Sequence, residues 1–331
     1  MDKPQHDSAW RIFTGQGDSH LASLPDAPPW RTFQGQPSDP PAFCVSQAYA
    51  PDDEKWKRAK TYQTPACALD AINAALLLRR PLLVTGKPGA GKSSLAYRVA
   101  YELALGPVLV WPINSRSSLK EGLYDYDAIA RLNDQRLDAS QAEDIGAYLS
   151  LRALGTALLP IERPRVLLID ELDKADPDLP NDLLHVFEEG CFDIPELQRH
   201  ASDNVEVKMM GEAKRVNINH GHVACKAFPF IVMTSNGERD FPPAFLRRCI
   251  RLELPDPDAE QLMAIVSAHL GEAVAQQAKQ RIAEFAAQQG ARTTATDQLL
   301  NALFIVHGVN GEKPGAAAAA ELDALLTQAL D

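Results

Sequence analysis

Short apolar runs alternate with amphipathic stretches through the middle of the chain, and this alternation predicts the fold class. Four runs are almost continuous in hydrophobic residues, as in strands buried on both faces, and they cover residues 82–84, 108–111, 166–169 and 228–233. Helices are predicted on either side of the first run, over residues 65–78 and 93–103. Apolar strands that alternate with helices indicate an α/β domain with a parallel sheet flanked by helices.

The pattern changes after the acidic, proline-containing segment at residues 255–258, where the composition becomes rich in Ala, Leu and Gln. Apolar positions then recur with helical spacing, which predicts helices over residues 258–270, 273–289, 296–307 and 316–330. We therefore expect a C-terminal all-α lid domain over residues 255–331.

The first 60 residues follow neither the helical nor the strand period and hold 8 of the 24 prolines. An extended, mostly irregular leader is predicted over residues 1–60, followed by the α/β domain over residues 61–254. Within the leader, WRIFTGQ at residues 10–16 recurs 20 residues later as WRTFQGQ at residues 30–36. One hypothesis is that the repeats dock onto a partner or a neighbouring protomer. The alternative is that both tryptophans cover apolar surface on their own α/β domain.

Charge and composition narrow the classes of function. The chain has 33 basic and 44 acidic residues, a net charge of −11, so a nucleic-acid partner is not expected. The longest stretch without a charged, hydroxyl or amide side chain has 11 residues, whereas a membrane span needs about 20. The first residues lack the apolar core of a signal peptide, and the five cysteines form no CxxC pair. A cytoplasmic protein without a membrane span or a disulfide framework is expected.

A glycine-rich turn between the first apolar strand and the next helix satisfies the pattern GxxxxGK[ST]. Its backbone N–H groups are expected to surround the β-phosphate of a nucleotide, because the glycines allow them to face inward and the helix N-terminus is positive. Lys92 would neutralise the β- and γ-phosphates, and the Ser93 hydroxyl would ligate Mg²⁺. The alternative, a glycine turn with a chance lysine, does not account for the strand and helix on either side. The predicted nucleotide-binding residues here are Gly86, Lys87, Pro88, Gly89, Ala90, Gly91, Lys92, Ser93 and Ser94.

Polar residues follow two of the other apolar strands. Asp170 and Glu171 come at the end of the strand at residues 166–169. The carboxyl edge of such a sheet is where ligands bind, so Asp170 would hold Mg²⁺ and Glu171 would polarise the attacking water as general base. Asn236 follows the strand at residues 228–233 and would orient the same water beside the γ-phosphate.

Two adjacent arginines, Arg247 and Arg248, occur in an otherwise apolar segment, where burial would require a partner anion. The γ-phosphate of a neighbouring subunit is one such anion, which would make one of them an arginine finger. An intramolecular salt bridge to the linker carboxylates Asp256 or Asp258 is the alternative. Arg292, just before the predicted helix at residues 296–307, could reach the nucleotide from the lid or remain solvated.

This ordered set of residues resembles the AAA+ ATPases over residues 65–330, and most closely the MoxR group. The group-level similarity lies in DELDKADP at residues 170–177 and LLHVFEEG at residues 183–190. The resemblance implies hairpin insertions around residues 123–129 and within residues 205–223. It also implies that Arg248 is the finger, Asn236 sensor 1 and Arg292 sensor 2, although unusual residues at positions 247 and 249 leave either arginine as the candidate finger.

The resemblance implies an ATP- and Mg²⁺-dependent ATPase that assembles into a homo-oligomeric ring, expected to be a hexamer, and remodels or switches partner proteins. Members of the group work with a separate protein that carries a von Willebrand factor A domain, so such a partner is implied. Two alternatives stay open. One is a McrB-like motor that acts on nucleic acid with a nuclease, and the other is a scaffold that binds ATP, oligomerises and turns over slowly.

Overall fold

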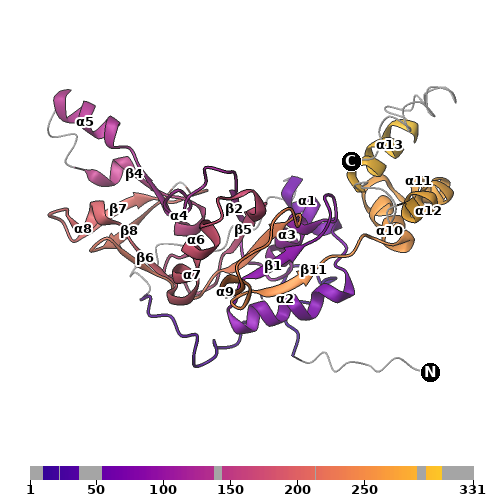
Figure 1. Cartoon of the computed structure of the whole chain (residues 1–331), viewed down its shortest axis with the longest axis horizontal. Coiled ribbons are helices and arrows are strands. Elements are labelled where there is room, and N and C mark those ends of the chain that lie inside the picture. Colours follow the sequence, from indigo (N-terminus) through magenta and orange to yellow (C-terminus); the bar gives the residue numbers. More distant parts are fainter. Residues whose placement is uncertain are drawn as a thin grey trace.

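The computed structural model describes residues 10–21, 23–36, 54–137, 144–212, 214–288 and 296–307. At its centre lies a five-stranded sheet in the order β11-β1-β10-β5-β2 (Figure 1). Every neighbouring pair in this sheet is parallel, so the predicted α/β class is confirmed. The strands are β1 (Leu82–Thr85), β2 (Leu109–Pro112), β5 (Val166–Asp170), β10 (Phe230–Ser235) and β11 (Ile250–Glu253). The fifth strand, β11, was not predicted.

The two faces of this sheet bury two different clusters because successive strand side chains point to opposite faces. In β1, Leu83 packs with one cluster while Leu82 and Val84 pack with the other. The helices of the Leu83 face are α4 (Leu119–Leu123), α6 (Ala153–Ala157) and α7 (Leu179–Glu189). The helices of the opposite face are α1 (Glu54–Thr61), α2 (Ala66–Leu78) and α3 (Lys92–Glu102). Helices on both faces were predicted, and α2 and α3 occupy nearly the predicted ranges.

Helix α1 lies where the irregular leader was predicted, so the boundary proposed at residue 60 falls inside a helix. Its Ala59 is fully buried, and the helix packs against α3. The sequence EKWKRAKT carries too few apolar residues to show a helical period by itself. The α/β domain therefore includes residues that composition alone assigned to the leader.

The leader repeats contact the α/β domain through their arginines and phenylalanines. Phe13 is fully buried beside α2 and α3, and Phe33 stacks on Phe228 with ring centroids 4.9 Å apart. The tryptophans, by contrast, remain 44% and 75% exposed at Trp10 and Trp30. Trp30 therefore covers little of its own domain and Trp10 only part of its surface, so the hypothesis that both tryptophans cover apolar surface there is not supported for Trp30. Docking of the repeats onto a partner or a neighbouring protomer stays a prediction.

A second, six-stranded sheet lies at one end of the central sheet, in the order β3-β4-β7-β8-β9-β6 (Figure 1). The predicted hairpin within residues 205–223 is present as the antiparallel pair β7–β8. Of the hairpin predicted around residues 123–129, strand β3 is present, but its antiparallel partner is β4, and helix α5 at residues 128–137 lies between the two strands. The strands are β3 (Tyr124–Tyr126), β4 (Leu149–Leu151), β6 (Cys191–Asp193), β7 (Asn204–Lys208), β8 (Arg215–Asn219) and β9 (His222–Ala224). The other short elements are α5 (Ala128–Leu137), η2 (Ile145–Tyr148), η3 (Leu172–Lys174), α8 (Pro195–Gln198) and α9 (Pro243–Leu246).

The lid helices lie at the opposite end of the central sheet from the second sheet (Figure 1). They share a separate hydrophobic cluster that includes Leu262, Ile282 and Leu299. The helices are α10 (Ala259–Leu270), α11 (Glu272–Gln277), α12 (Lys279–Gln288) and α13 (Thr296–His307). The single helix predicted over residues 273–289 is thus two, with a turn at Ala278, and the helix predicted over residues 316–330 lies outside the described residues. No helix in the described ranges combines the length and the apolarity that crossing a bilayer requires.

Candidate nucleotide site

The glycine-rich turn at residues 86–91 joins β1 to the N-terminus of α3, as its sequence predicted. Gly91 has a φ of 81°, in the left-handed region that favours glycine. A Cβ atom at this position would lie 2.8 Å from the Tyr62 ring, so the close approach of Tyr62 also requires glycine. The turn therefore brings the first backbone N–H groups of α3 and its positive end to the edge of the sheet.

The Lys92 side chain is held inside this turn. Its Nζ donates hydrogen bonds to the carbonyl oxygens of Gly86 at 2.7 Å and Lys87 at 2.8 Å, and to Oδ1 of Asn236 at 2.8 Å. Lys92 is only 8% exposed, and this burial lowers its pKa below the ordinary value, while the carboxylates of Asp173 and Asp170 act in the opposite direction. The structure thus brings together the two predicted residues Lys92 and Asn236.

Asp170 is the centre of a hydroxyl–carboxylate network at the end of β5. Its Oδ1 accepts hydrogen bonds from the hydroxyls of Ser93 and Thr234, both at 2.7 Å. The Thr234 hydroxyl in turn accepts a hydrogen bond from the backbone N–H of Glu171 at 2.8 Å. Oxygen atoms of this kind are the ligands that Mg²⁺ prefers, so the Ser93–Asp170 pair fits a magnesium ion that also binds nucleotide phosphates. Thr234 was not among the predicted residues, because a threonine in a buried strand carries no sequence signal of this role.

Glu171 has a left-handed backbone, with a φ of 60°. Its Oε2 lies 2.8 Å from Nζ of Lys174 in the following 3₁₀ turn, and this hydrogen bond raises the pKa of Lys174. Non-glycine residues in the left-handed region are uncommon and concentrate at functional sites. The unusual backbone at the predicted general base is therefore consistent with a functional position.

Asp173 fixes the turn that carries Asn236. Its Oδ2 accepts hydrogen bonds from the backbone N–H of Asn236 at 2.8 Å and of Glu238 at 3.2 Å, and the residue is buried. Asp173 belongs to η3, the short helix that begins directly after Glu171. The segment that follows β5 therefore also holds the backbone at the end of β10. Asp173 is a further residue that sequence analysis did not single out, since its partner lies 63 positions away.

These groups line a pocket of about 820 Å³ between the α/β domain and the lid. Residues 88–94, Asp170, Glu171 and Asn236 all contribute to its wall, together with residues 61–65 and side chains of α10 and α13. The Tyr62 hydroxyl at this wall is buried and has no hydrogen-bond partner among the residues that the structure describes, and burial raises its pKa above the usual range. Residues 61–65 had no predicted role, and Arg292 lies outside the described residues.

The two candidate finger arginines do not line this pocket. Nε of Arg248 lies 2.8 Å from Oε1 of Glu188 at the end of α7, and its Nη1 donates to the carbonyl of Ala244 at 3.1 Å. Arg247 is exposed. The expected alternative partner, Asp256, pairs instead with Lys87 at 2.7 Å. Arg248 therefore does form an intramolecular ion pair, but the prediction that its partner is the acidic linker is wrong.

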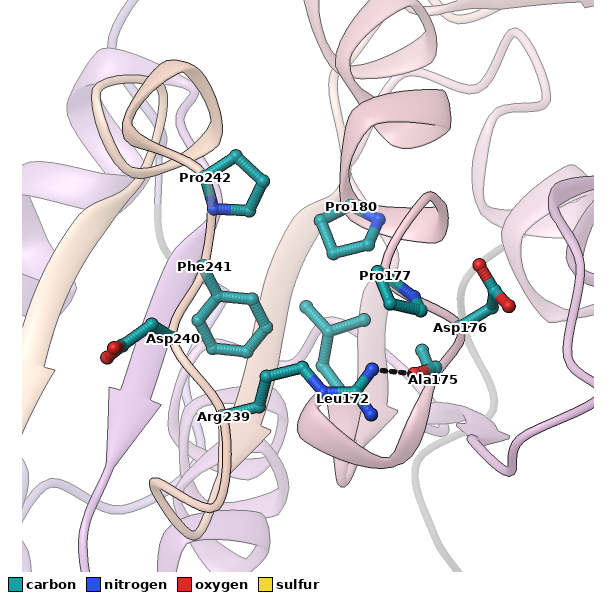
Figure 2. Close-up of a pocket in the computed structure, with 9 residues that line it drawn as sticks. All are labelled: Leu172, Ala175, Asp176, Pro177, Pro180, Arg239, Asp240, Phe241 and Pro242. Atoms are coloured by element: carbon teal, nitrogen blue, oxygen red, sulfur yellow. Dashed lines mark hydrogen bonds between the residues drawn. The ribbon is translucent and has the colours of Figure 1, made fainter.

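A smaller cavity of about 280 Å³ lies beside η3, away from the nucleotide pocket. Figure 2 shows the Phe241 ring facing Leu172, Pro177 and Pro180 across it. The Arg239 guanidinium borders this cavity and donates a hydrogen bond to the carbonyl of Ala175 at 2.7 Å. This contact and the Asp173 bonds together attach the segment after Asn236 to η3.

The chain is similar to known proteins in sequence and in structure. Residues 81–249 match the family model described as the AAA domain, dynein-related subfamily. The chain is 27% identical over 266 residues to gas vesicle ATPase GvpN2 of Halobacterium salinarum, an alignment that covers 77% of this chain and 68% of the relative. The crystal structure of domain III of the replication initiation protein DnaA from Thermotoga maritima aligns with a TM-score of 0.44 and 16% identity, covering 84% of this chain and 100% of that one. Because the family match spans half of the chain and includes the phosphate loop, the protein belongs to the dynein-related AAA family and is an ATP-hydrolysing AAA+ ATPase.

Proposed function

We propose that the chain is a MoxR-type AAA+ ATPase that forms a homo-oligomeric ring and uses ATP turnover to remodel or switch a partner protein. The segments that resemble the MoxR group form one structural unit: residues 170–177 run from β5 through η3 to the start of α7, and residues 183–190 form its second half. The β7–β8 hairpin is one of the insertions that the group implies.

The position of Arg248 carries this proposal. It is 40% exposed and absent from the wall of its own nucleotide pocket. Hydrolysis develops negative charge on the γ-phosphate, and an arginine that stabilises this charge accelerates the reaction greatly. Arg248 lies outside its own pocket, so it would act on the nucleotide of a neighbouring subunit, and a closed ring gives every pocket one such neighbour.

Within the pocket each residue has a proposed role that follows from its contacts. Lys92 would exchange its carbonyl and Asn236 partners for the β- and γ-phosphates, and Ser93 with Asp170 would hold Mg²⁺. Glu171 would leave Lys174 and accept a proton from the attacking water, which Asn236 orients. Mg²⁺ would neutralise phosphate charge when bound.

The partner is proposed from similarity and charge. One relative is named as a gas vesicle ATPase, and the MoxR resemblance implies a separately encoded protein with a von Willebrand factor A domain. A net charge of −11 supports a protein partner over a nucleic acid.

Subunit mixing tests the ring and the finger together. Arg248→Ala should bind ATP normally and lose at least about 100-fold in kcat. Glu171→Gln should also bind ATP and fail to hydrolyse it. Rings that contain both variants should regain activity, because some interfaces join an intact Glu171 to an intact Arg248.

The other outcomes are equally specific. No recovery in rings shown to exchange subunits would contradict a finger that acts between subunits. If Arg247→Ala is inactive and Arg248→Ala is not, the finger is Arg247. A ring also requires the ATPase rate per subunit to rise with protein concentration as the subunits assemble. An ATPase rate per subunit that is the same at all these concentrations would argue against the ring.

A further inference from the structure

The second leader repeat is attached to the same carboxylate as the candidate finger. Glu188 lies at the end of α7 and bridges two arginines that are far apart in the sequence. Its Oε1 is 2.8 Å from Nε of Arg248, and its Oε2 is 3.1 Å from Nη1 of Arg31. Each carboxylate oxygen thus serves one arginine, and Arg31 lies 157 residues before Glu188 in the chain.

Arg31 is held more firmly than an ordinary surface arginine. It is 7% exposed, and its guanidinium also donates to the backbone carbonyls of Phe187 at 2.9 Å and Arg79 at 2.7 Å. The same group lies 5.2 Å from the centres of the Phe33 and Phe228 rings, within the range of cation–π attraction. A guanidinium bound on several sides has little freedom, so it fixes the position of the Glu188 oxygen it touches.

The rest of the repeat keeps Arg31 in place. The backbone N–H of Gly35 donates to the carbonyl of Cys225 at 3.0 Å, and a Cβ at Gly35 would lie 2.1 Å from the carbonyl oxygen of Ala224. Only glycine allows this approach. The Phe33 ring stacks on Phe228 on the other side. The second repeat is therefore held against the end of α7 and against β9, and Arg31, Phe33 and Gly35 each make a contact there.

We propose that Arg31 is a positioning residue for Arg248: it fixes Glu188, and Glu188 orients the Arg248 guanidinium toward the nucleotide of the neighbouring protomer. This inference rests on the proposed function, in which Arg248 acts between subunits. Nε of Arg248 lies within ion-pair distance of Glu188, Nη1 donates to Ala244, and the side chain is 40% exposed, so part of the guanidinium stays open to an incoming phosphate. The second leader repeat thereby becomes part of the catalytic interface, although it touches no nucleotide.

The first repeat supplies a matched control. Arg11 holds the same place in its copy as Arg31, and it pairs with Asp70 on α2 at 2.8 Å. Asp70 is 64% exposed, and its ion pair within the described residues is with Arg11 and not with Arg247 or Arg248. Glu189, adjacent to Glu188 and likewise exposed, is a control for charge at the end of α7.

Steady-state ATPase kinetics of the full chain separate positioning from folding. Arg31→Ala and Glu188→Gln should each lower kcat about tenfold and leave KM for ATP within about twofold of the wild-type value. The loss in kcat is smaller than that expected for removal of the finger itself, because Arg248 is still present. Arg11→Ala and Glu189→Gln should keep the kcat of the wild type. Equal losses of kcat in Arg11→Ala and Arg31→Ala would mean that detaching either repeat from the α/β domain lowers activity in the same way. That result would overturn the proposal.

Subunit mixing assigns the defect to one side of the interface. Arg31→Ala subunits keep an intact pocket and lack an oriented finger, so mixing them with Glu171→Gln subunits should restore activity. Mixing them with Arg248→Ala subunits should restore none, because both variants lack the same contribution. Recovery of activity with Arg248→Ala subunits, or no recovery with Glu171→Gln subunits, would overturn the role of Arg31. Because a misfolded Arg31→Ala subunit would also fail to recover with Glu171→Gln, the same mixtures are repeated with Glu188→Gln in place of Arg31→Ala.

These measurements distinguish the two levels of the proposal. If Arg248→Ala has the kcat of the wild type, the proposed function fails and this inference fails with it. If Arg248→Ala is inactive while Arg31→Ala and Glu188→Gln are fully active, the finger stands and only the positioning role is overturned.

Discussion

The Nζ atom of Lys92 lies 2.8 Å from Oδ1 of Asn236, a residue 144 positions further along the chain. Two P-loop carbonyls accept from the same ammonium group, so its three hydrogens all have partners within the chain. Phosphates can reach Lys92 only by replacing some of these contacts. We expect the release of Asn236 to free its amide for the attacking water, which would couple nucleotide binding to the orientation of that water.

We expect Lys92→Ala to weaken ATP binding by about 100-fold or more, or roughly 2.8 kcal/mol, because no other described cation lies inside the phosphate loop. The measurement is titration with a fluorescent ATP analogue. Lys87→Ala is a matched control, since that side chain pairs with Asp256 and only its backbone faces the loop. A loss for Lys87→Ala as large as that for Lys92→Ala would contradict the assignment.

Thr234→Val should reduce kcat by about 10- to 100-fold while the protein stays folded. The substitution keeps the shape of the side chain and removes the hydroxyl that joins Asp170 to the backbone of Glu171. The Asp170 carboxylate then loses one of its two hydroxyl partners, and the backbone N–H of Glu171 loses its acceptor. ATPase rates and thermal melting of the same preparations test this.

The control for this variant is Thr85→Val at the end of the adjacent strand β1. Its hydroxyl lies 3.5 Å from the Leu252 carbonyl, at the limit of a hydrogen bond, and has no contact with Asp170. Thr85→Val should retain most of the activity. Unchanged turnover in Thr234→Val would show that the hydroxyl network is structural alone.

The elements that the sequence predicted well are those with a local signal. Strand β5 is apolar along its length because both faces are buried, and the phosphate loop is a contiguous motif between β1 and α3. The second sheet lacked such a signal, because strands such as β3 and β6 have three residues each and are defined by distant partners. Three residues are too few to establish a period.

The same distinction applies to the site. Lys92, Ser93, Asp170, Glu171 and Asn236 follow from motif and order, and the structure brings them to one edge of the sheet. The roles of Thr234, Asp173 and Glu188 depend on contacts across 63 to 157 positions. Threonine, aspartate and glutamate are common residues in strands, turns and helix ends. Only the contacts in the folded chain therefore distinguish Thr234, Asp173 and Glu188 from other residues of the same type.

Phe13→Ala should destabilise the protein by about 3–5 kcal/mol, and its melting temperature should fall by several degrees. Phe13 is fully buried, and Asn73 Oδ1 accepts hydrogen bonds from the backbone of residues 12 and 13 at 2.7 and 2.9 Å. Trp30→Ala, at a 75% exposed site, should change the melting temperature little. A similar fall in both variants would contradict the view that the phenylalanine, and not the tryptophan, attaches a repeat to its domain.

Thiol labelling reports directly on the second repeat. Burial raises the pKa values of Cys225 and Cys249 to about 12, so at pH 8 only about one thiol in ten thousand is ionised, whereas Cys67 is exposed. In the wild type, Cys67 should react with iodoacetamide much faster than the two buried cysteines, as measured by mass spectrometry of the digested protein. The labelling rate of a buried thiol should increase about tenfold for each pH unit up to its pKa.

Phe33→Ala should accelerate the labelling of Cys225 and leave that of Cys249 unchanged. The Phe33 ring and the Cys225 sulfur both lie against Gly190, where a Cβ would come within 2.5 Å of the ring and 2.7 Å of the sulfur. Without the ring, this side of Cys225 opens to solvent, and the thiolate becomes easier to form because its desolvation decreases. Cys249 donates instead to the carbonyl of Phe245, away from the repeat, and serves as the internal control. Faster labelling of both cysteines would indicate general loosening of the core, and no change in either would mean that the repeat does not cover Cys225 in solution.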